Sequence, residues 1–167
     1  MTQTSGTRHP TRNDLREEVR GPMVELLNAQ LADAIHLAMQ AKQAHWNVKG
    51  PHFAQLHELF DQAYAQATGW VDLVAERAVQ LGGAAEGTLA AVHGRTRLPA
   101  YDEGLVAGQA HVEALTQSLA NLAASTRAAV DQADEAGDKG TADLFTEVSR
   151  EADKLLWMLE AHLHPER

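Results

Sequence analysis

Cysteine is absent from the 167 residues of this chain, which excludes disulfides, thiolate metal sites and a cysteine nucleophile. No apolar run approaches the roughly 18 residues that a transmembrane helix needs, and the N-terminus lacks the hydrophobic core of a signal peptide. Aromatic residues make up only 5%, whereas alanine, leucine and glutamine are abundant, a composition that favours helices over sheets. We therefore expect a helical, cytoplasmic protein with no membrane partner.

An excess of basic residues is also lacking, because the formal net charge is −9. Proteins that bind nucleic acid normally present a basic face, so this charge argues against a general polyanion binder. An acidic protein attracts cations instead, and the attraction grows if many subunits close into a shell. A chain of 167 residues is long enough for one domain with a full core and too short for two.

The chain divides into a polar N-terminal tail and one helical domain. Residues 1–13 are small and polar without hydrophobic periodicity, which predicts a flexible tail, and residues 14–167 form the domain. Apolar residues at helical spacing predict four long helices, over residues 22–48, 53–81, 104–135 and 141–163. A short helix over residues 14–20 is expected to be interrupted at Gly21 and Pro22.

The connection between the second and third long helices is the most informative one. Antiparallel neighbours need only about 2–8 residues between them, whereas residues 82–103 are enough to cross a whole bundle. The second and third long helices would then run parallel. This pattern predicts an all-α, ferritin-like four-helix bundle with one long crossover.

Potential metal ligands gather between residues 43 and 83. They are His45, His57, Asp61, Asp72 and Glu76. His57 and Asp61 are four residues apart, as are Asp72 and Glu76, so each pair shares one face of a helix. Asp61 and Asp72 would lie about 16 Å apart along that helix, which is too far to share an ion.

A second copy of the same helix, antiparallel across a two-fold axis, removes this difficulty. The two pairs are placed symmetrically about one point near the helix centre, so His57 would face the partner's Glu76 and Asp61 would face the partner's Asp72. Because a two-fold contact occurs twice, we infer two equivalent metal sites shared between subunits. Any one of these side chains alone would more often be a solvated surface group.

The ligand chemistry narrows the choice of metal. Two imidazoles and three carboxylates form a nitrogen and oxygen set that suits iron, manganese or zinc. A carboxylate-rich site with open positions is what Fe(II) oxidation requires, since the oxidant must reach the metal. Trp46, beside His45, is interpreted as packing at the helix end and also as a redox neighbour of the metal. A metallohydrolase is the enzyme alternative, because residues 57–61 nearly match H-E-x-x-H, but the second histidine is missing.

Two further groups have weaker functional interpretations. Arg8 and Arg12 in the tail are candidate DNA contacts, or simply part of a solvated terminus. Asp138 and Asp143, near the start of the fourth long helix, interact favourably with the helix dipole. The same two aspartates are candidates for the lining of an ion pore.

Several motifs together resemble the Dps family of miniferritins. They are the segments KQAHWNVKG and LHELFD, the spaced D-x-x-x-E-R, Leu81-Gly82-Gly83, and Asp153 to Trp157 near the end. The resemblance covers nearly the whole chain beyond the tail, and the family's ferroxidase ligands match all five candidates. It implies that His45, His57 and Asp61 come from one subunit, and Asp72 and Glu76 from its two-fold mate.

The resemblance also implies a hollow homo-dodecamer built from two-fold dimers. Such proteins bind Fe(II), oxidise it with hydrogen peroxide in preference to oxygen, and store the ferric mineral inside, which protects against oxidative damage. Trp46 matches the tryptophan beside the family's iron site, and Asp143, with Asp138, would face a three-fold pore that admits iron. Some members condense DNA through lysine-rich tails, whereas this tail carries only Arg8 and Arg12. The alternative function is a nucleoid protein that acts mainly by weak, non-specific DNA binding.

Overall fold

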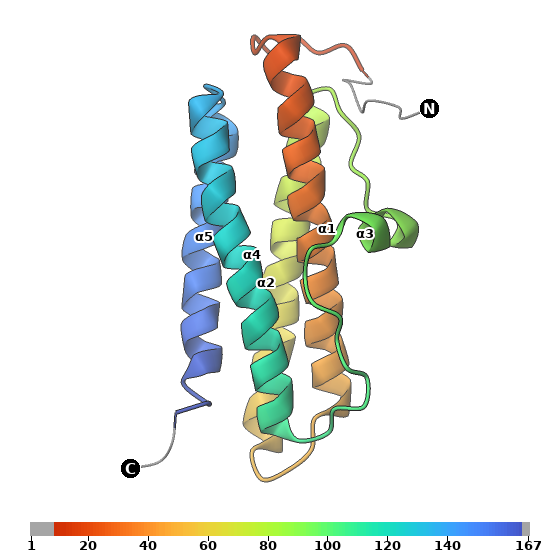
Figure 1. Ribbon diagram of the computed structural model, residues 1–167, viewed down its shortest axis with the longest axis vertical. Helices are drawn as coiled ribbons and strands as arrows, with labels where there is room; N and C mark the ends of the chain where they lie inside the picture. Colours follow the sequence, from red (N-terminus) through yellow and green to blue (C-terminus); the bar gives the residue numbers. More distant parts are fainter. Residues whose placement is uncertain (1–8, 165–167) are drawn as a thin grey trace.

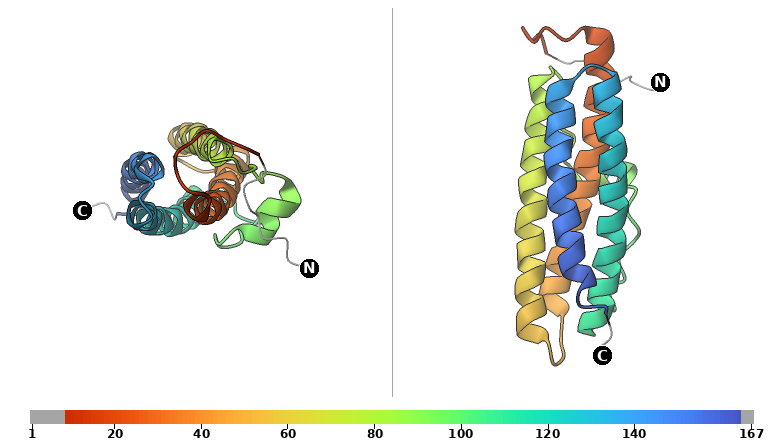
Figure 2. Two further views of the ribbon diagram at one scale, coloured as in Figure 1. Left: turned by 90° about the horizontal axis from the view of Figure 1, so that it is seen from above. Right: turned by 90° about the vertical axis from the view of Figure 1, so that its left-hand side faces the viewer.

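Four long helices run along a common axis in the computed structural model, which describes residues 9–164 (Figure 1). They are α1 (Glu17–Asn47), α2 (Phe53–Gln80), α4 (Gly108–Glu135) and α5 (Lys139–Glu160), and a short helix, α3 (Leu89–Arg95), lies outside the bundle (Figure 2). The described residues contain no strand, and one isolated bridge joins Lys49 to Ala107. The expected all-α bundle is confirmed. None of the helices within residues 9–164 combines the length and the apolarity needed to cross a membrane.

The path of the chain makes α2 and α4 parallel. In Figure 1, α1 descends and α2 rises, the crossover returns to the lower end, α4 rises, and α5 descends. The predicted long crossover is therefore confirmed. It differs from the prediction in containing α3 and in continuing past Gly104 to the start of α4 at Gly108.

Apolar side chains of the four long helices fill the centre of the bundle. One cluster, toward the turn between α1 and α2, includes Phe60, Trp70 and Leu119, and a second cluster includes Leu27 and Phe145. Truncating a fully buried leucine to alanine typically costs about 2–5 kcal/mol, so these contacts hold the helices in a fixed arrangement. The outer face of α2 is thereby presented as a rigid surface.

The N-terminal part of α1 differs from the prediction. A break at Gly21 and Pro22 was expected, but α1 continues from Glu17 through both residues, so that prediction is wrong. Pro22 is exposed, and within the helix it removes one backbone hydrogen bond. The side chains of Val24 and Leu27 are 1% and 0% exposed, and their packing offsets the roughly 3 kcal/mol that an internal proline costs.

The end of α2 is built around two glycines, as the sequence predicted. Gly82 has a φ of +85°, and a Cβ there would lie 2.7 Å from the backbone oxygen of His9. A Cβ on Gly83 would lie 2.4 Å from a methyl group of Val24. The backbone N–H of His9 donates to the carbonyl of Gly82 at 3.0 Å, so the described end of the tail lies against α2. Arg8 lies outside the described residues.

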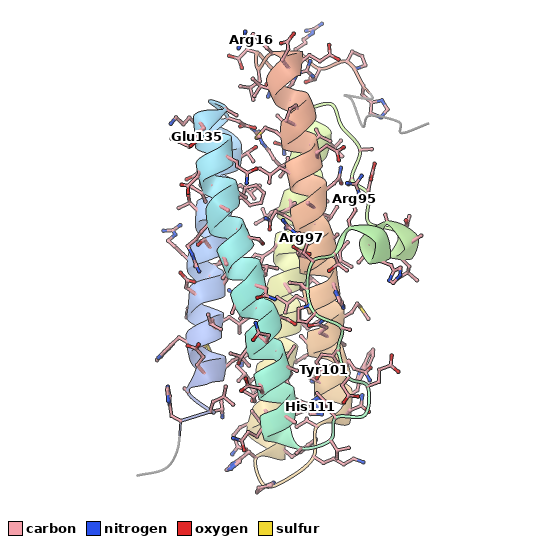
Figure 3. All side chains as sticks on the ribbon, in the orientation of Figure 1. Arg16, Arg95, Arg97, Tyr101, His111 and Glu135 are labelled. Carbon is pink, nitrogen blue, oxygen red and sulfur yellow. The ribbon has the colours of Figure 1, made fainter. Side chains whose placement is uncertain are left out.

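Polar contacts hold the crossover against the bundle. The carboxylate of Asp33 on α1 is 1% exposed and accepts hydrogen bonds from Arg97, from its backbone N–H at 2.7 Å and its Nη2 at 2.6 Å. Nearer the start of α4, the hydroxyl of Tyr101 lies 2.6 Å from Nδ1 of His111, and both residues are labelled in Figure 3. Burial raises the pKa of Tyr101, which keeps its phenol protonated. These contacts fix the crossover on the side of the bundle occupied by α1 and α4.

Candidate metal centre

The turn between α1 and α2 brings two of the predicted ligands together. His45 lies in the last turn of α1, and His57 lies four residues after the start of α2 at Phe53. The chain reverses through Gly50, whose φ of 120° is a conformation that glycine adopts readily. The last turn of α1 therefore lies alongside the first turns of α2.

His45 and His57 hold each other in place. Their rings stack with centroids 3.6 Å apart and an interplanar angle of 23°. Nδ1 of His45 donates to the backbone carbonyl of His57 at 2.7 Å, and Nδ1 of His57 donates to the carbonyl of His45 at 2.8 Å. Because a carbonyl can only accept, each neutral ring carries its proton on Nδ1 and its lone pair on Nε2. A hydrogen bond on the far nitrogen fixes the orientation of metal-binding histidines in the same way.

Asp61 lies one turn after His57 and forms an ion pair with Lys42 of α1. The hydrogen bond from Lys42 lowers the pKa of Asp61, and the charge of Lys42 and the nearby rings of His45 and His57 act in the same direction. The ammonium group of Lys42 also lies over the ring of Tyr64, 4.8 Å from its centroid. The carboxylate of Asp61 is therefore ionised at neutral pH and binds one cation, the ammonium group of Lys42, within the chain.

Asp72 and Glu76 lie on the second half of α2. Both are exposed, and neither makes a hydrogen bond or an ion pair with another residue of the described range 9–164. A groove of about 440 Å³ lies beside Glu76. It is lined by Ala75, Glu76, Val79, Gln80 and Ala85. This half of α2 thus offers two free carboxylates next to a hollow surface.

A single chain keeps the five candidates in two separate groups. His45, His57 and Asp61 lie near the turn, and Asp72 and Glu76 lie about three helical turns further along α2. Within the part of the chain that the structure describes, no three His, Asp or Glu side chains form a group that could hold a metal ion. Ligation by all five residues would require a second copy of the chain.

Asp138 has a structural position at the start of α5. Its carboxylate is 1% exposed, accepts from the backbone N–H of Thr141 at 3.0 Å, and pairs with Nη2 of Arg77 at 2.6 Å. The predicted favourable contact with the start of this helix is confirmed. A carboxylate engaged in this way is a poor candidate for a pore lining. Asp143 is exposed and stays the pore candidate.

Two other predicted functional residues lie at the surface. The side chain of Trp46, next to His45, is 60% exposed, so packing within one chain covers less than half of it. Arg12, in the described part of the tail, is also exposed. The roles of both residues, and of Arg8 beyond the described range, stay predictions.

Lys42 and Phe53 belong to this region, although the sequence did not single them out. Lys42 lies one helical turn before His45, and Phe53 lies one turn before His57, so helical spacing could have placed both on the site. The ring of Phe53 is 5.0 Å from that of His57, and its side chain is 47% exposed. Neither the ion pair nor this exposure can be read from spacing alone.

Comparison with known proteins gives a consistent result. The family model of the ferritin-like domain matches residues 24–167. A DNA protection during starvation protein of Agrobacterium fabrum is 46% identical over 155 residues, which are 93% of this chain and 96% of that protein. The structure of DpsC from Streptomyces coelicolor matches with a TM-score of 0.93 and 30% identity, over 100% of this chain and 98% of that chain. A Dps protein from Vibrio cholerae O1, described as a member of the superfamily of ferritin-like diiron-carboxylate proteins, matches with a TM-score of 0.84 and 26% identity, over 88% and 92% of the two chains.

Proposed function

Because the chain belongs to the Dps family of the ferritin-like superfamily, we propose that two copies share centres that bind Fe(II) and oxidise it. Iron is the substrate of this reaction, and the ferric product is stored as a mineral inside a hollow shell. The ligands of each centre are His45, His57 and Asp61 of one copy, with the partner's Asp72 and the partner's Glu76.

The observation that carries this proposal is the reciprocal locking of His45 and His57. Nδ1 of each ring donates its proton to the backbone carbonyl of the other residue. The Nε2 atom of each ring therefore keeps a free lone pair, and the turn between α1 and α2 fixes the position of both rings. The pair is half-buried and lies next to the ionised carboxylate of Asp61, rather than within the apolar core. Nitrogen and oxygen donors held together in this way suit a divalent transition metal.

The charge of the joined site also supports a cation. Asp61, the partner's Asp72 and the partner's Glu76 would bring three carboxylates together, against the single ammonium group of Lys42. Carboxylates at this range repel one another unless a cation compensates their charge. Fe(II) would supply that charge, and protons would compete with it for the same lone pairs, so affinity should fall with acid.

The redox chemistry balances with hydrogen peroxide as oxidant. Two Fe(II) ions each lose one electron, and the O–O bond of one peroxide molecule takes up both and breaks. With two molecules of water the products are two FeO(OH) units and four protons. Open coordination positions let the oxidant reach the iron directly. Oxygen is the other oxidant, and removing peroxide together with Fe(II) suppresses the formation of hydroxyl radicals.

The proposed assembly is a homo-dodecamer of two-fold dimers in the cytoplasm. The Dps proteins that match over nearly the whole chain support a shared mode of folding and of assembly. In a closed shell the net charge of −9 on each copy would concentrate cations at the surface. Asp143 is the residue that we place at the pore through which iron enters.

Replacing both histidines tests the proposal. The His45→Ala/His57→Ala variant should form ferric product at least tenfold more slowly when Fe(II) and peroxide are mixed, because two ligands are lost while the core is unchanged. Optical absorbance follows the reaction, and light scattering gives the mass of the shell. The matched control is His93→Ala, which removes an exposed histidine on α3, outside the bundle. An unchanged rate in an intact shell would show that the ligands are assigned wrongly.

Non-specific DNA binding is the second candidate function. It is favoured by the name of the Agrobacterium fabrum relative, a DNA protection during starvation protein. A gel shift at increasing salt, with the full chain and with a chain lacking residues 1–13, tests it. Binding through Arg8 and Arg12 should disappear with the tail and weaken with salt, because phosphate contacts release counterions. Binding that survives the deletion would exclude the tail as the contact.

A further inference from the structure

We infer that Phe53 of each copy lies in the groove beside the partner's Glu76 and covers the shared metal site. This contact rests on the proposed two-fold site and adds an apolar element to it. The occupant of the groove is thus a second copy of this chain. Three features support the inference: the exposed ring of Phe53, the apolar walls of the groove that Glu76 also lines, and a glycine inside α2.

The first feature is the exposed aromatic side chain at the start of α2. Phe53 is 47% exposed, and its ring is tilted by 30° against that of His57 at a centroid distance of 5.0 Å. Single exposed apolar residues are common on protein surfaces. This one is in contact with a ligand ring, so anything that covers Phe53 also covers one side of the site.

The second feature is the groove at the other end of the same helix. Its walls include Ala75, Val79 and Ala85, and Val79 is 51% exposed. The antiparallel register that places His57 opposite the partner's Glu76 also places Phe53 at the level of this groove. That register follows from the ligand pairs alone. The match between the apolar ring of Phe53 and the apolar walls of the groove is therefore independent support for it. Burying a phenylalanine covers roughly 150–250 Å² of surface.

The third feature is a glycine near the centre of the interface. Gly69 lies inside α2, is exposed, and a Cβ added to it would meet nothing within 4 Å. Glycine inside a helix costs roughly 0.5–1 kcal/mol relative to alanine, and the contacts of one chain give no reason for it. The same register places the partner's Tyr64 at the level of Gly69. A missing side chain there gives room for close approach of the second helix.

Disulfide cross-linking tests the contact directly, because the chain contains no cysteine of its own. The double variant Phe53→Cys/Val79→Cys should form covalent chain pairs on mild oxidation, seen on a non-reducing gel. Each single variant should stay uncoupled, since position 53 of one copy lies far from position 53 of the other. The control Phe53→Cys/Gln117→Cys places the second thiol on the exposed face of α4 and should not couple. Failure of the double variant to couple in assembled protein would overturn the inference.

The contribution of Phe53 to the site is measured with Zn²⁺, which binds similar ligands and is not oxidised. Phe53→Ala should weaken Zn²⁺ binding to the assembled protein by about tenfold in calorimetry, and Phe53→Leu should restore most of it. Unchanged affinity in Phe53→Ala would contradict the covering role. Gly69→Leu should lower the mass of the assembly without loss of helix content, and an assembly of unchanged mass would count against the close approach.

The two proposals fail in different ways. Cross-linked pairs that do not oxidise Fe(II) would retain the contact and remove the proposed function. Iron oxidation that depends on His45 and His57, in a protein whose double-cysteine variant never couples, would retain the function and remove the contact.

Discussion

At the scale of single residues, two backbone carbonyls decide which nitrogen each site histidine offers. His45 and His57 are bound through Nδ1 at 2.7 and 2.8 Å, so Nε2 is the atom left for a metal. The sequence predicted both histidines as ligands and placed His57 on one helix face with Asp61, and these assignments stay predictions. It could not predict this exchange of hydrogen bonds, because the exchange depends on how closely the turn at Gly50 brings α1 and α2 together.

Lys42 forms an ion pair with Asp61. A metal bound at the proposed site would have to displace Lys42 from this carboxylate or share the carboxylate with it. Removing it with Lys42→Met should tighten Zn²⁺ binding by about fivefold at most, because an exposed ion pair is worth roughly 0.2–1 kcal/mol. Calorimetry at neutral pH measures the change, and Lys154→Met on the exposed face of α5 is the control. Weaker binding in Lys42→Met would show that the ammonium group supports the site rather than competing for it.

At the scale of helices and connections, the crossover is attached to α1 by a polar cluster. His36 contacts the hydroxyl of Thr96 through Nδ1 at 2.9 Å, and Nε2 lies 3.1 Å from the amide nitrogen of Gln40. Burial lowers the pKa of His36, Asp33 opposes this effect, and His93 adds to it. The folded state therefore prefers the neutral ring.

This preference makes the stability depend on pH. Above about pH 6.5 the ring is neutral in both the folded and unfolded states, so the stability does not change with pH through His36. Below that value the unfolded chain takes up a proton that the folded chain resists, so stability falls until the folded pKa is passed. Urea unfolding at pH 7.5 and 5.5 should show a smaller loss for His36→Gln than for the parent chain. Equal losses in the two proteins would contradict this role of His36.

Asp138 both caps α5 and compensates Arg77 of α2. Asp138→Ala should lower the free energy of unfolding by about 3 kcal/mol, since it leaves the mostly buried guanidinium unpaired and removes a cap. Asp138→Asn can still cap the helix and should cost less. Asp143→Asn, an exposed change one turn later, is the control for urea unfolding. A loss below about 0.5 kcal/mol in Asp138→Ala would mean that this ion pair does not stabilise the bundle.

Long elements could be predicted from the sequence, and local exceptions could not. Apolar spacing predicted the four long helices, and the length of the connection over residues 82–103 predicted the parallel crossover. The expected break at Gly21 and Pro22 is wrong, because the packing of Val24 and Leu27 overrides the local preference of proline. Apolar spacing also missed α3, which is only 7 residues long and whose N-cap is Thr88. A helix of that length has too few turns to show periodicity.

At the scale of the whole molecule, the described part of one chain keeps the five candidate ligands in two separate groups and holds no complete metal site. Asp72 and Glu76, in the second half of α2, have no hydrogen-bond or ion-pair partner within the described chain. In the first half, His57 is hydrogen-bonded to the backbone of His45, and Asp61 is paired with Lys42. The sequence predicted that the two ligand pairs lie apart on one helix, and their union in a site shared by two copies stays a prediction. It could not supply the groove or the exposed Phe53, since both depend on which neighbours cover α2.

Complementation between two inactive variants tests the shared centre most directly. His45→Ala/His57→Ala lacks one half of every site, and Asp72→Ala/Glu76→Ala lacks the other. When equal amounts are assembled together, half of the two-fold pairs are mixed and each mixed pair has one intact centre, so about a quarter of the parent rate of peroxide-driven Fe(II) oxidation should return. A mixture of verified mass that is no more active than the separate variants would contradict a centre shared between two copies.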